Sequence, residues 1–264
     1  SDLCYLAAPS RPTLSAAELP VLDALPGLRD ALARSNTAIL QAPPGAGKST
    51  VLPLRLLDEP WLEGRKILML EPRRLAARAV AWRLADQLNE EPGATVGFRV
   101  RFESVVGKTT RIEVVTEGIL TRMLQEDNGL EGVGLVIFDE FHERSLDNDL
   151  ALGLIRLLQT TIRPELKIVV MSATLATDKL SEYLQAGPRE GSSQPIPAPT
   201  ITSEGRLFPV EIEYEPRSLQ HPWPVAAATA VERLFARTPG DILCFLPGMQ
   251  EIRQAARELA SLGR

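Results

Sequence analysis

The stretch Thr37-Ala-Ile-Leu-Gln-Ala-Pro-Pro-Gly-Ala-Gly-Lys-Ser-Thr50 joins a short apolar run to a glycine-rich loop and a helical segment. From Ala42 onward it matches the phosphate-binding pattern G-x-x-x-x-G-K-[ST], except that alanine replaces the first glycine. Such a loop turns backbone N–H groups toward phosphate oxygens, and the positive end of the following helix faces the same anion. The stretch therefore predicts a strand, a phosphate loop and a helix in the order that nucleotide binding requires.

This loop supplies particular groups for ATP and Mg²⁺. Gly45 and Gly47 permit the backbone turn, Lys48 would reach the β and γ phosphates, and the Ser49 hydroxyl would be a ligand of Mg²⁺. The expected nucleotide contacts are Pro44, Gly45, Ala46, Gly47, Lys48, Ser49 and Thr50. A Gly/Pro-rich turn between a strand and a helix, with an exposed lysine, is the alternative interpretation.

A second buried run, Gly134-Leu-Val-Ile-Phe-Asp-Glu-Phe-His142, ends in two adjacent carboxylates. Asp139 would hold Mg²⁺, mostly through water, while Glu140, also expected beside the metal, would orient and deprotonate the water that attacks the γ phosphate. An acidic helix N-terminus is the alternative, because carboxylates favour the positive end of a helix. Together with the phosphate loop, the pair indicates a catalytic site for phosphoryl transfer.

Apolar runs alternate with amphipathic stretches along the first 190 residues, which predicts an α/β fold with a parallel sheet covered by helices on both faces. The expected strands are Thr37 to Gln41, Lys66 to Leu70, Gly97 to Phe102, Arg111 to Val115, Leu135 to Phe138 and Lys167 to Met171.

The segment from 187 to 203 interrupts this alternation. Nine of its 17 residues are Pro, Gly or Ser, so we place a linker there and divide the chain into domains 1–203 and 204–264. The second part is expected to begin another α/β domain, with strands Phe208 to Tyr214 and Asp241 to Leu246 and helices Val225 to Ala236 and Met249 to Leu262.

Composition excludes several classes of protein. The 264 residues are 44% hydrophobic and 24% charged, with a net charge of −5, which argues against a protein that coats nucleic acid through bulk charge. No apolar run suggests a membrane span or a signal peptide, so a cytoplasmic location is expected. Cys4 and Cys244 cannot build a disulfide framework or a zinc site. The missing initiator Met and the end at Arg264 suggest a piece of a longer protein.

Further motifs resemble the DEAH/RHA group of superfamily 2 RNA helicases, most of all its bacterial HrpB branch. Asp139-Glu-Phe-His142 is similar to the D-E-x-H box of that group, with Phe141 where most members have alanine. The other matching segments are Glu71-Pro-Arg-Arg-Leu-Ala-Ala77, Val96-Gly-Phe-Arg-Val-Arg-Phe-Glu103, Thr116-Glu-Gly-Ile-Leu120, Ser172-Ala-Thr174 and Gly240-Asp-Ile-Leu-Cys-Phe-Leu-Pro-Gly248.

The resemblance implies two RecA-like domains with ATP between them and single-stranded RNA across their top. Only the first would be complete here, and the second would be a truncated start that lacks the family's arginine fingers. Such fingers are worth roughly 10³ to 10⁵ in rate, so this chain would bind nucleotide but hydrolyse it poorly, and it would not unwind RNA. The remainder of the same helicase chain would be its partner, and no membrane is expected.

Several roles follow from the resemblance. Arg73 and Arg74 come directly after a strand, at the sheet edge where ligands of doubly wound folds bind. Arg73, Arg74, Arg101 and Thr116 would contact the RNA backbone without reading its sequence. Arg83 would stack on the adenine, although a solvated helix face is the alternative for that arginine.

His142 would link the nucleotide site to Ser172 and Thr174 as the two domains close. Both hydroxyls could instead cap the helix after Met171, a role that is compatible with coupling. The leading function is therefore an ATP-hydrolysing module of an RNA helicase. A DNA-directed motor stays open, because phosphate contacts do not distinguish RNA from DNA. A nucleotide-dependent clamp without turnover stays open as well.

Overall fold

The computed structural model describes residues 19–127, 129–173, 178–185, 196–205, 209–214 and 222–262. The contacts within the chain divide it into a first unit, residues 1–207, and a second unit, residues 208–264. All the strands of the described residues lie in the first unit.

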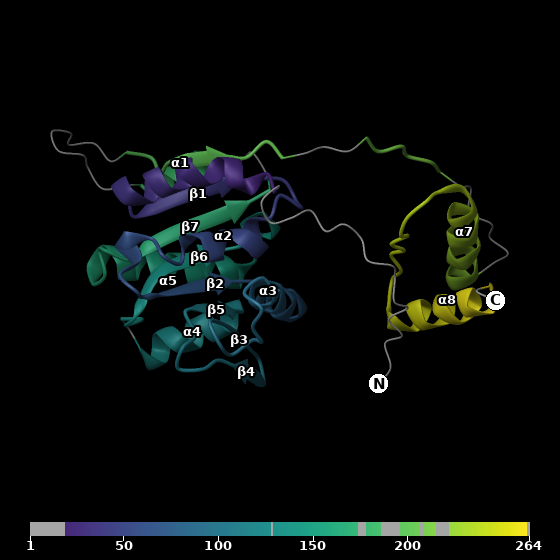
Figure 1. The fold of residues 1–264 in the computed structure, drawn as a ribbon, viewed down its shortest axis with the longest axis horizontal. Coiled ribbons are helices and arrows are strands. Elements are labelled where there is room, and N and C mark those ends of the chain that lie inside the picture. Colours follow the sequence, from purple (N-terminus) through teal and green to yellow (C-terminus); the bar gives the residue numbers. More distant parts are fainter. Residues whose placement is uncertain are drawn as a thin grey trace. The chain divides into compact units, whose positions relative to one another are not determined.

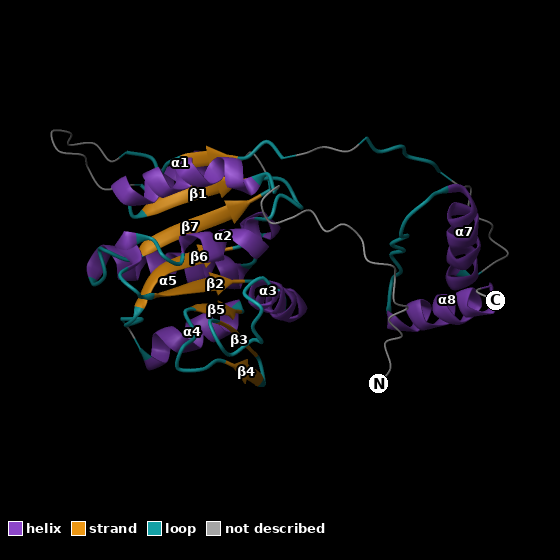
Figure 2. Ribbon diagram, viewed as in Figure 1, coloured by secondary structure: helices purple, strands orange, loops and turns teal. Residues whose placement is uncertain are grey.

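An eight-stranded sheet forms the centre of the first unit, in the order β4-β3-β5-β2-β6-β7-β1-β8. Figure 1 shows its labelled strands in this order, and Figure 2 shows the arrows of the central strands pointing the same way. The strands are β1 (Thr37–Gln41), β2 (Lys66–Leu70), β3 (Val96–Val100), β4 (Glu103–Val105), β5 (Ile112–Val115), β6 (Val133–Phe138), β7 (Lys167–Ser172) and β8 (Thr200–Thr202). All neighbours pair in parallel except β3 and β4.

Helices cover both faces of the sheet, as the sequence predicts. Helices α1 (Val21–Arg34), α2 (Lys48–Leu56) and α3 (Arg74–Asp86) pack on one face, where they share a core with Ala38 and Leu40 of β1. Helices α4 (Glu117–Glu126), α5 (Leu146–Thr161) and α6 (Asp178–Tyr183) share the other core with Ile39. Because successive side chains of a strand point to opposite faces, one apolar run supplies both cores.

Two strands of the first unit were not expected. The chain turns at Arg101 and Phe102, so β3 ends at Val100, two residues earlier than expected, and β4 pairs antiparallel beside it. Strand β8 lies within the segment assigned to the linker and pairs in parallel with β1 at the edge of the sheet. A short edge strand tolerates the prolines before it, because only one of its sides pairs with a neighbour.

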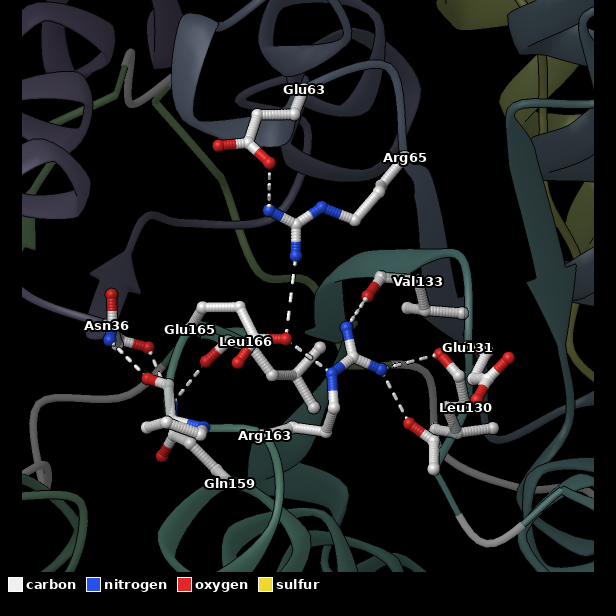
Figure 3. Close-up of polar contacts among 12 residues, drawn as sticks. Asn36, Glu63, Arg65, Leu130, Glu131, Val133, Gln159, Arg163, Glu165 and Leu166 are labelled. Atoms are coloured by element: carbon white, nitrogen blue, oxygen red, sulfur yellow. Dashed lines mark hydrogen bonds and ion pairs between the residues drawn. The ribbon is translucent and has the colours of Figure 1, made fainter.

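A polar network ties together the ends of the strands opposite the phosphate loop (Figure 3). The Arg163 guanidinium donates to the carbonyl oxygens of Gly129, Leu130 and Val133 over 2.6–2.9 Å. Gln159 Nε2 donates to the carbonyls of Asn36 and Leu166. These side chains supply additional donors to carbonyl oxygens at the starts of β1, β6 and β7.

The second unit consists of α7 (Trp223–Arg237) and α8 (Met249–Leu262), so both expected helices are confirmed. The two expected strands are wrong over their described residues, 209–214 and 241–246, which form no strand. Their alternating apolar side chains, such as Ile212 and Phe245, are 72% and 86% exposed. A strand needs a hydrogen-bonding neighbour, and the described part of this unit supplies none. None of the described helices is long and apolar enough to cross a bilayer.

Candidate functional site

Apart from Arg83 on α3 and Thr174 outside the described residues, the predicted site residues lie at or just after the carboxyl ends of the parallel strands. The strand order divides them into two groups. The adjacent strands β6, β7 and β1 end at Asp139, Ser172 and the phosphate loop. The adjacent strands β2, β5 and β3 lead into Arg73, Thr116 and Arg101. The edge of the sheet that is formed by the carboxyl ends of its strands therefore has a nucleotide half and a basic half. The two halves meet where β2 lies beside β6.

The phosphate loop, residues 42–50, has the backbone that its motif requires. Gly45 and Gly47 have φ angles of 79° and 91°, in the left-handed region that favours glycine. The Lys48 side chain is buried, and its Nζ donates to the carbonyl oxygens of Ala42 at 2.8 Å and Pro43 at 3.4 Å. The ammonium is thus held inside the turn, beside the positive end of α2.

A cavity of about 310 Å³ opens beside this loop. Its lining joins the loop to the carboxylate of Glu140 and to the predicted adenine residue Arg83: Leu19, Gly45, Ala46, Gly47, Lys48, Ser49, Thr50, Arg83 and Glu140. The Arg83 guanidinium is half-exposed and forms a surface ion pair with Asp86 at 3.3 Å. The groups predicted to bind phosphate and the predicted catalytic carboxylate therefore face one space, with an arginine at its edge.

Asp139 is buried at the end of β6 and fits the role of a metal ligand. Its backbone N–H donates to the carbonyl oxygen of Leu70 at 3.0 Å, and its Oδ1 accepts the N–H of Glu140 at 2.8 Å. Its Oδ2 is buried without a hydrogen-bond partner among the described residues. A buried carboxylate oxygen without a donor is a ready ligand for a hard cation such as Mg²⁺.

Glu71 lies beside Asp139, since β2 and β6 are neighbours. Burial, and then the charge of Asp139, raise the pKa of Glu71 to about 10. Among the described residues, no group donates a hydrogen bond to its Oε1. This is expected where two carboxylates face each other, because neither can donate without a proton. A proton retained on Glu71 leaves the negative charge of the pair on Asp139.

Glu140 begins a tight turn, with φ 47° and ψ 35°, ahead of the 3-10 helix η3 (Phe141–Glu143). Burial raises the pKa of Glu140, the charge of Asp139 adds to this rise, and the charge of Lys48 opposes it. His142 Nε2 lies 3.3 Å from Glu140 Oε2, and His142 Nδ1 accepts the backbone N–H of Ala173 at 3.2 Å. Both contacts fit the neutral imidazole with its proton on Nε2.

This imidazole therefore joins the segment after β6 to the end of β7. Ser172, the last residue of β7, is buried at that junction. Thr174, the other predicted coupling residue, lies outside the described residues.

The basic half of the edge is more exposed. Arg73 forms an ion pair with Glu143 at 2.9 Å, and Arg74 is the exposed first residue of α3. The Arg101 guanidinium lies 4.7 Å from the centre of the Phe102 ring, and that ring is 89% exposed. Thr116 is the residue before the first turn of α4 and makes no side-chain capping bond. Exposed arginines beside an exposed ring suit phosphates and bases.

Residues 27–183 match the model of the DEAD/DEAH box helicase family. The chain belongs to this family. It is 51% identical over 92% of its length to the Escherichia coli protein named ATP-dependent RNA helicase HrpB, and 36% identical to E. coli HrpA. The crystal structure of the E. coli DEAH/RHA helicase HrpB matches 92% of the chain with a TM-score of 0.81 and 51% identity. The fold of the first unit is therefore the RecA-like domain of these helicases.

The chain is much shorter than these helicases. It spans 29% of the length of E. coli HrpB and 18% of that of HrpA. What a whole helicase does is therefore a proposal for this chain.

Sequence reasoning assigned no role to four residues of this helicase site. Glu71 and Phe102 lie inside motifs that match the helicase family. The sequence signal for Glu71 was a carboxylate at the end of an apolar strand, and for Phe102 it was an aromatic residue in a basic turn. Leu19, which lines the cavity, and Gly205, which lies against Pro43, are distant in sequence from every motif. No local pattern could have indicated those two contacts.

Proposed function

We propose that this chain is the ATP-binding and ATP-hydrolysing module of a DEAH-box RNA helicase. The observation that carries the proposal is the convergence of Lys48, Ser49 and Glu140 on one cavity, with the buried Asp139 at the end of the neighbouring strand β6. The relatives named as ATP-dependent RNA helicases support the same function. On its own the chain is expected to bind nucleotide and to turn it over slowly.

Each residue has a part in this proposal. Loop N–H groups and Lys48 hold the phosphates, while Ser49 and Asp139 hold Mg²⁺. Bound Mg²⁺ would neutralise charge that develops on the phosphate oxygens. Glu140 accepts a proton from the attacking water, and its raised pKa makes it a stronger base than an exposed glutamate. Arg83, at the edge of the cavity, would stack on the adenine.

Single-stranded RNA is the proposed partner of the basic half. Arg73, Arg74, Arg101 and Thr116 come from three adjacent strand ends, so they form one row along the sheet edge. Arg73 can exchange its surface ion pair for a phosphate at little cost, because such pairs contribute at most about 1 kcal/mol. Backbone contacts of this kind give salt-sensitive binding that does not depend on sequence.

Binding of fluorescent ATP with Mg²⁺ tests the nucleotide site directly. Lys48→Ala should abolish binding, while Lys108→Ala, at an exposed turn lysine, should not change it. Glu140→Gln should retain binding and slow hydrolysis by roughly 10² to 10⁴. Equal affinity in wild type and Lys48→Ala would refute the site.

The proposed RNA partner is tested by ATP hydrolysis. The measurement uses a longer chain that extends to the full length of these relatives. We expect stimulation by single-stranded RNA and not by the matching DNA. Equal stimulation by both would favour a DNA-tolerant motor, and no stimulation would favour a clamp.

A further inference from the structure

The segment Ser203 to Gly205 lies against the phosphate loop, although more than 150 residues separate them in the sequence. It follows β8 directly and precedes Phe208, where the second unit begins. Ser203 is buried, and its backbone N–H donates to the carbonyl oxygen of Gln41 at 2.8 Å. Gln41 is the last residue before the loop, so this segment is fixed beside the start of the phosphate loop.

Gly205 makes the closest approach. Its φ of +66° is in the left-handed region, and a Cβ on this residue would overlap the Cγ of Pro43 and lie 3.1 Å from its Cδ. A proline ring is held in the loop backbone and cannot rotate away as a long side chain can. Only glycine therefore fits between this backbone and the loop.

The backbone of Pro43 is bonded to other groups of the loop. The carbonyl oxygen of Pro43 accepts both the Nζ of Lys48 at 3.4 Å and the backbone N–H of Ala46 at 3.3 Å. A displacement of the ring would shift this carbonyl and, with it, the ammonium that is expected to reach the phosphates. Gly205 is thus connected to Lys48 through one intervening residue, Pro43.

A second contact braces the same loop. The Ser203 hydroxyl donates to the carbonyl oxygen of Pro20 at 3.0 Å, and the next residue, Val21, donates its N–H to the carbonyl of Ala46 at 3.0 Å. Leu19, just before them, packs against Gly47. The loop is therefore held between two backbone segments, which come from the start and the end of the first unit.

We propose that Gly205 is a positioning residue of the nucleotide site, which sets Lys48 through Pro43 and joins the loop to the segment that leads into the second unit. The proposal rests on the proposed nucleotide function. It implies reciprocity: a nucleotide that fixes the loop also fixes residues 203–205.

The test compares nucleotide affinity with stability in the 264-residue chain. Gly205→Ala introduces both the left-handed alanine and the overlap with Pro43. Gly64→Ala is the matched control, because Gly64 has a φ of +73° and an added methyl group there would meet nothing within 4 Å, so only the backbone cost remains. Dissociation constants for fluorescent ATP with Mg²⁺ and the midpoints of thermal unfolding are measured for both variants.

We expect both variants to unfold at a lower temperature, but only Gly205→Ala to bind nucleotide about tenfold more weakly. Pro43→Ala removes the ring atom, so Gly205→Ala/Pro43→Ala should bind within about threefold of Pro43→Ala alone. Equal affinities in Gly205→Ala and Gly64→Ala, or no rescue by Pro43→Ala, would overturn the positioning role while leaving the nucleotide function intact. Failure of the wild-type chain to bind would instead refute the proposed function and this inference with it.

Discussion

His142 Nδ1 accepts the backbone N–H of Ala173 at 3.2 Å, while its Nε2 lies 3.3 Å from Glu140 Oε2. One ring thus connects the proposed catalytic base to the strand end that carries Ser172. The two contacts use different ring nitrogens, so they can be separated by substitution.

Asparagine and glutamine at position 142 would each reproduce one of the two contacts of the His142 ring. In His142→Asn the amide oxygen can replace Nδ1 and keep the bond to Ala173, whereas His142→Gln places its amide nearer to Glu140. We expect RNA-stimulated hydrolysis in the longer chain to fall about tenfold in His142→Gln and to stay within about threefold in His142→Asn. Nucleotide affinity serves as the control and should not change. Indistinguishable rates for the two variants would show that the Ala173 contact carries no coupling.

Glu71 should make stability depend on pH. Its pKa is about 10 in the folded chain and about 4.5 as its ordinary value, so between these pH values the folded state holds one proton more than the unfolded state. This contribution is complete below about pH 4.5 and is lost as pH rises, by up to about 1.4 kcal/mol per pH unit. In Glu71→Gln, the decline of unfolding free energy between about pH 5 and pH 9 should therefore be shallower. Urea unfolding across this range measures it.

Glu126→Gln provides the control for this experiment, since Glu126 is exposed and ion-paired with Arg122 at 2.8 Å. The free energy of unfolding of Glu126→Gln should depend on pH as it does in the wild-type chain. The same slope in Glu71→Gln and wild type would mean that Glu71 is ionised in the folded chain.

Phe102 combines exposure with an unfavourable backbone, and the two properties predict opposite effects of one substitution. Its φ is 69°, a region that bulky side chains rarely adopt. Phe102→Gly should therefore raise the free energy of unfolding by about 1 kcal/mol. It should also weaken binding of single-stranded RNA about tenfold, because a stacking surface is lost.

Salt dependence separates stacking from charge at this turn. In fluorescence anisotropy with labelled oligouridine, Phe102→Gly should not change the slope of log K against log salt, whereas Arg74→Ala should reduce it by about 0.7. Phe102→Tyr keeps the ring and should keep the affinity. Unchanged RNA affinity in Phe102→Gly would exclude the ring from the interface.

Arg163 should matter for stability alone, because it lies at the opposite end of the strands from the nucleotide. Arg163→Ala removes three hydrogen bonds to carbonyl oxygens, of which Leu130 O keeps a second donor, and should lower the free energy of unfolding by about 2–4 kcal/mol. Arg163→Lys should recover only part of this loss, since a single ammonium cannot match the fork of a guanidinium. Urea unfolding gives the stability, and nucleotide affinity should stay the same in both variants.

Much of the first unit is predictable because its information is local. Most of the expected strands there are apolar runs that contribute to both cores, and the phosphate loop contains its own glycines and lysine. Strand β8 is different, because Thr200 to Thr202 become a strand only through the neighbouring β1. The same reasoning explains the second unit, where Val210 and Leu243 have the alternation of a strand but no ladder in the described residues.

The site shows the same division. Lys48, Asp139 and Glu140 follow from motifs, and the structure places them at two nearby strand ends. The contact of His142 with Ala173, the proximity of Glu71 to Asp139, and the approach of Gly205 to Pro43 each join segments that are far apart in the sequence. Such contacts depend on strand order, which no local pattern records.

The position of β1 in the sheet also has a consequence for folding. This strand precedes all the others, yet Thr37 pairs with Ile168 of β7 and Ile39 with Thr200 of β8. Contacts between such distant parts of a chain form slowly, because long loops must close before any ladder bond compensates for the lost entropy. During synthesis, β1, the strand that leads into the phosphate loop, is therefore enclosed only after almost the whole first unit has been made. Nucleotide affinity would then report completed folding, which makes ATP a natural probe of the last folding step.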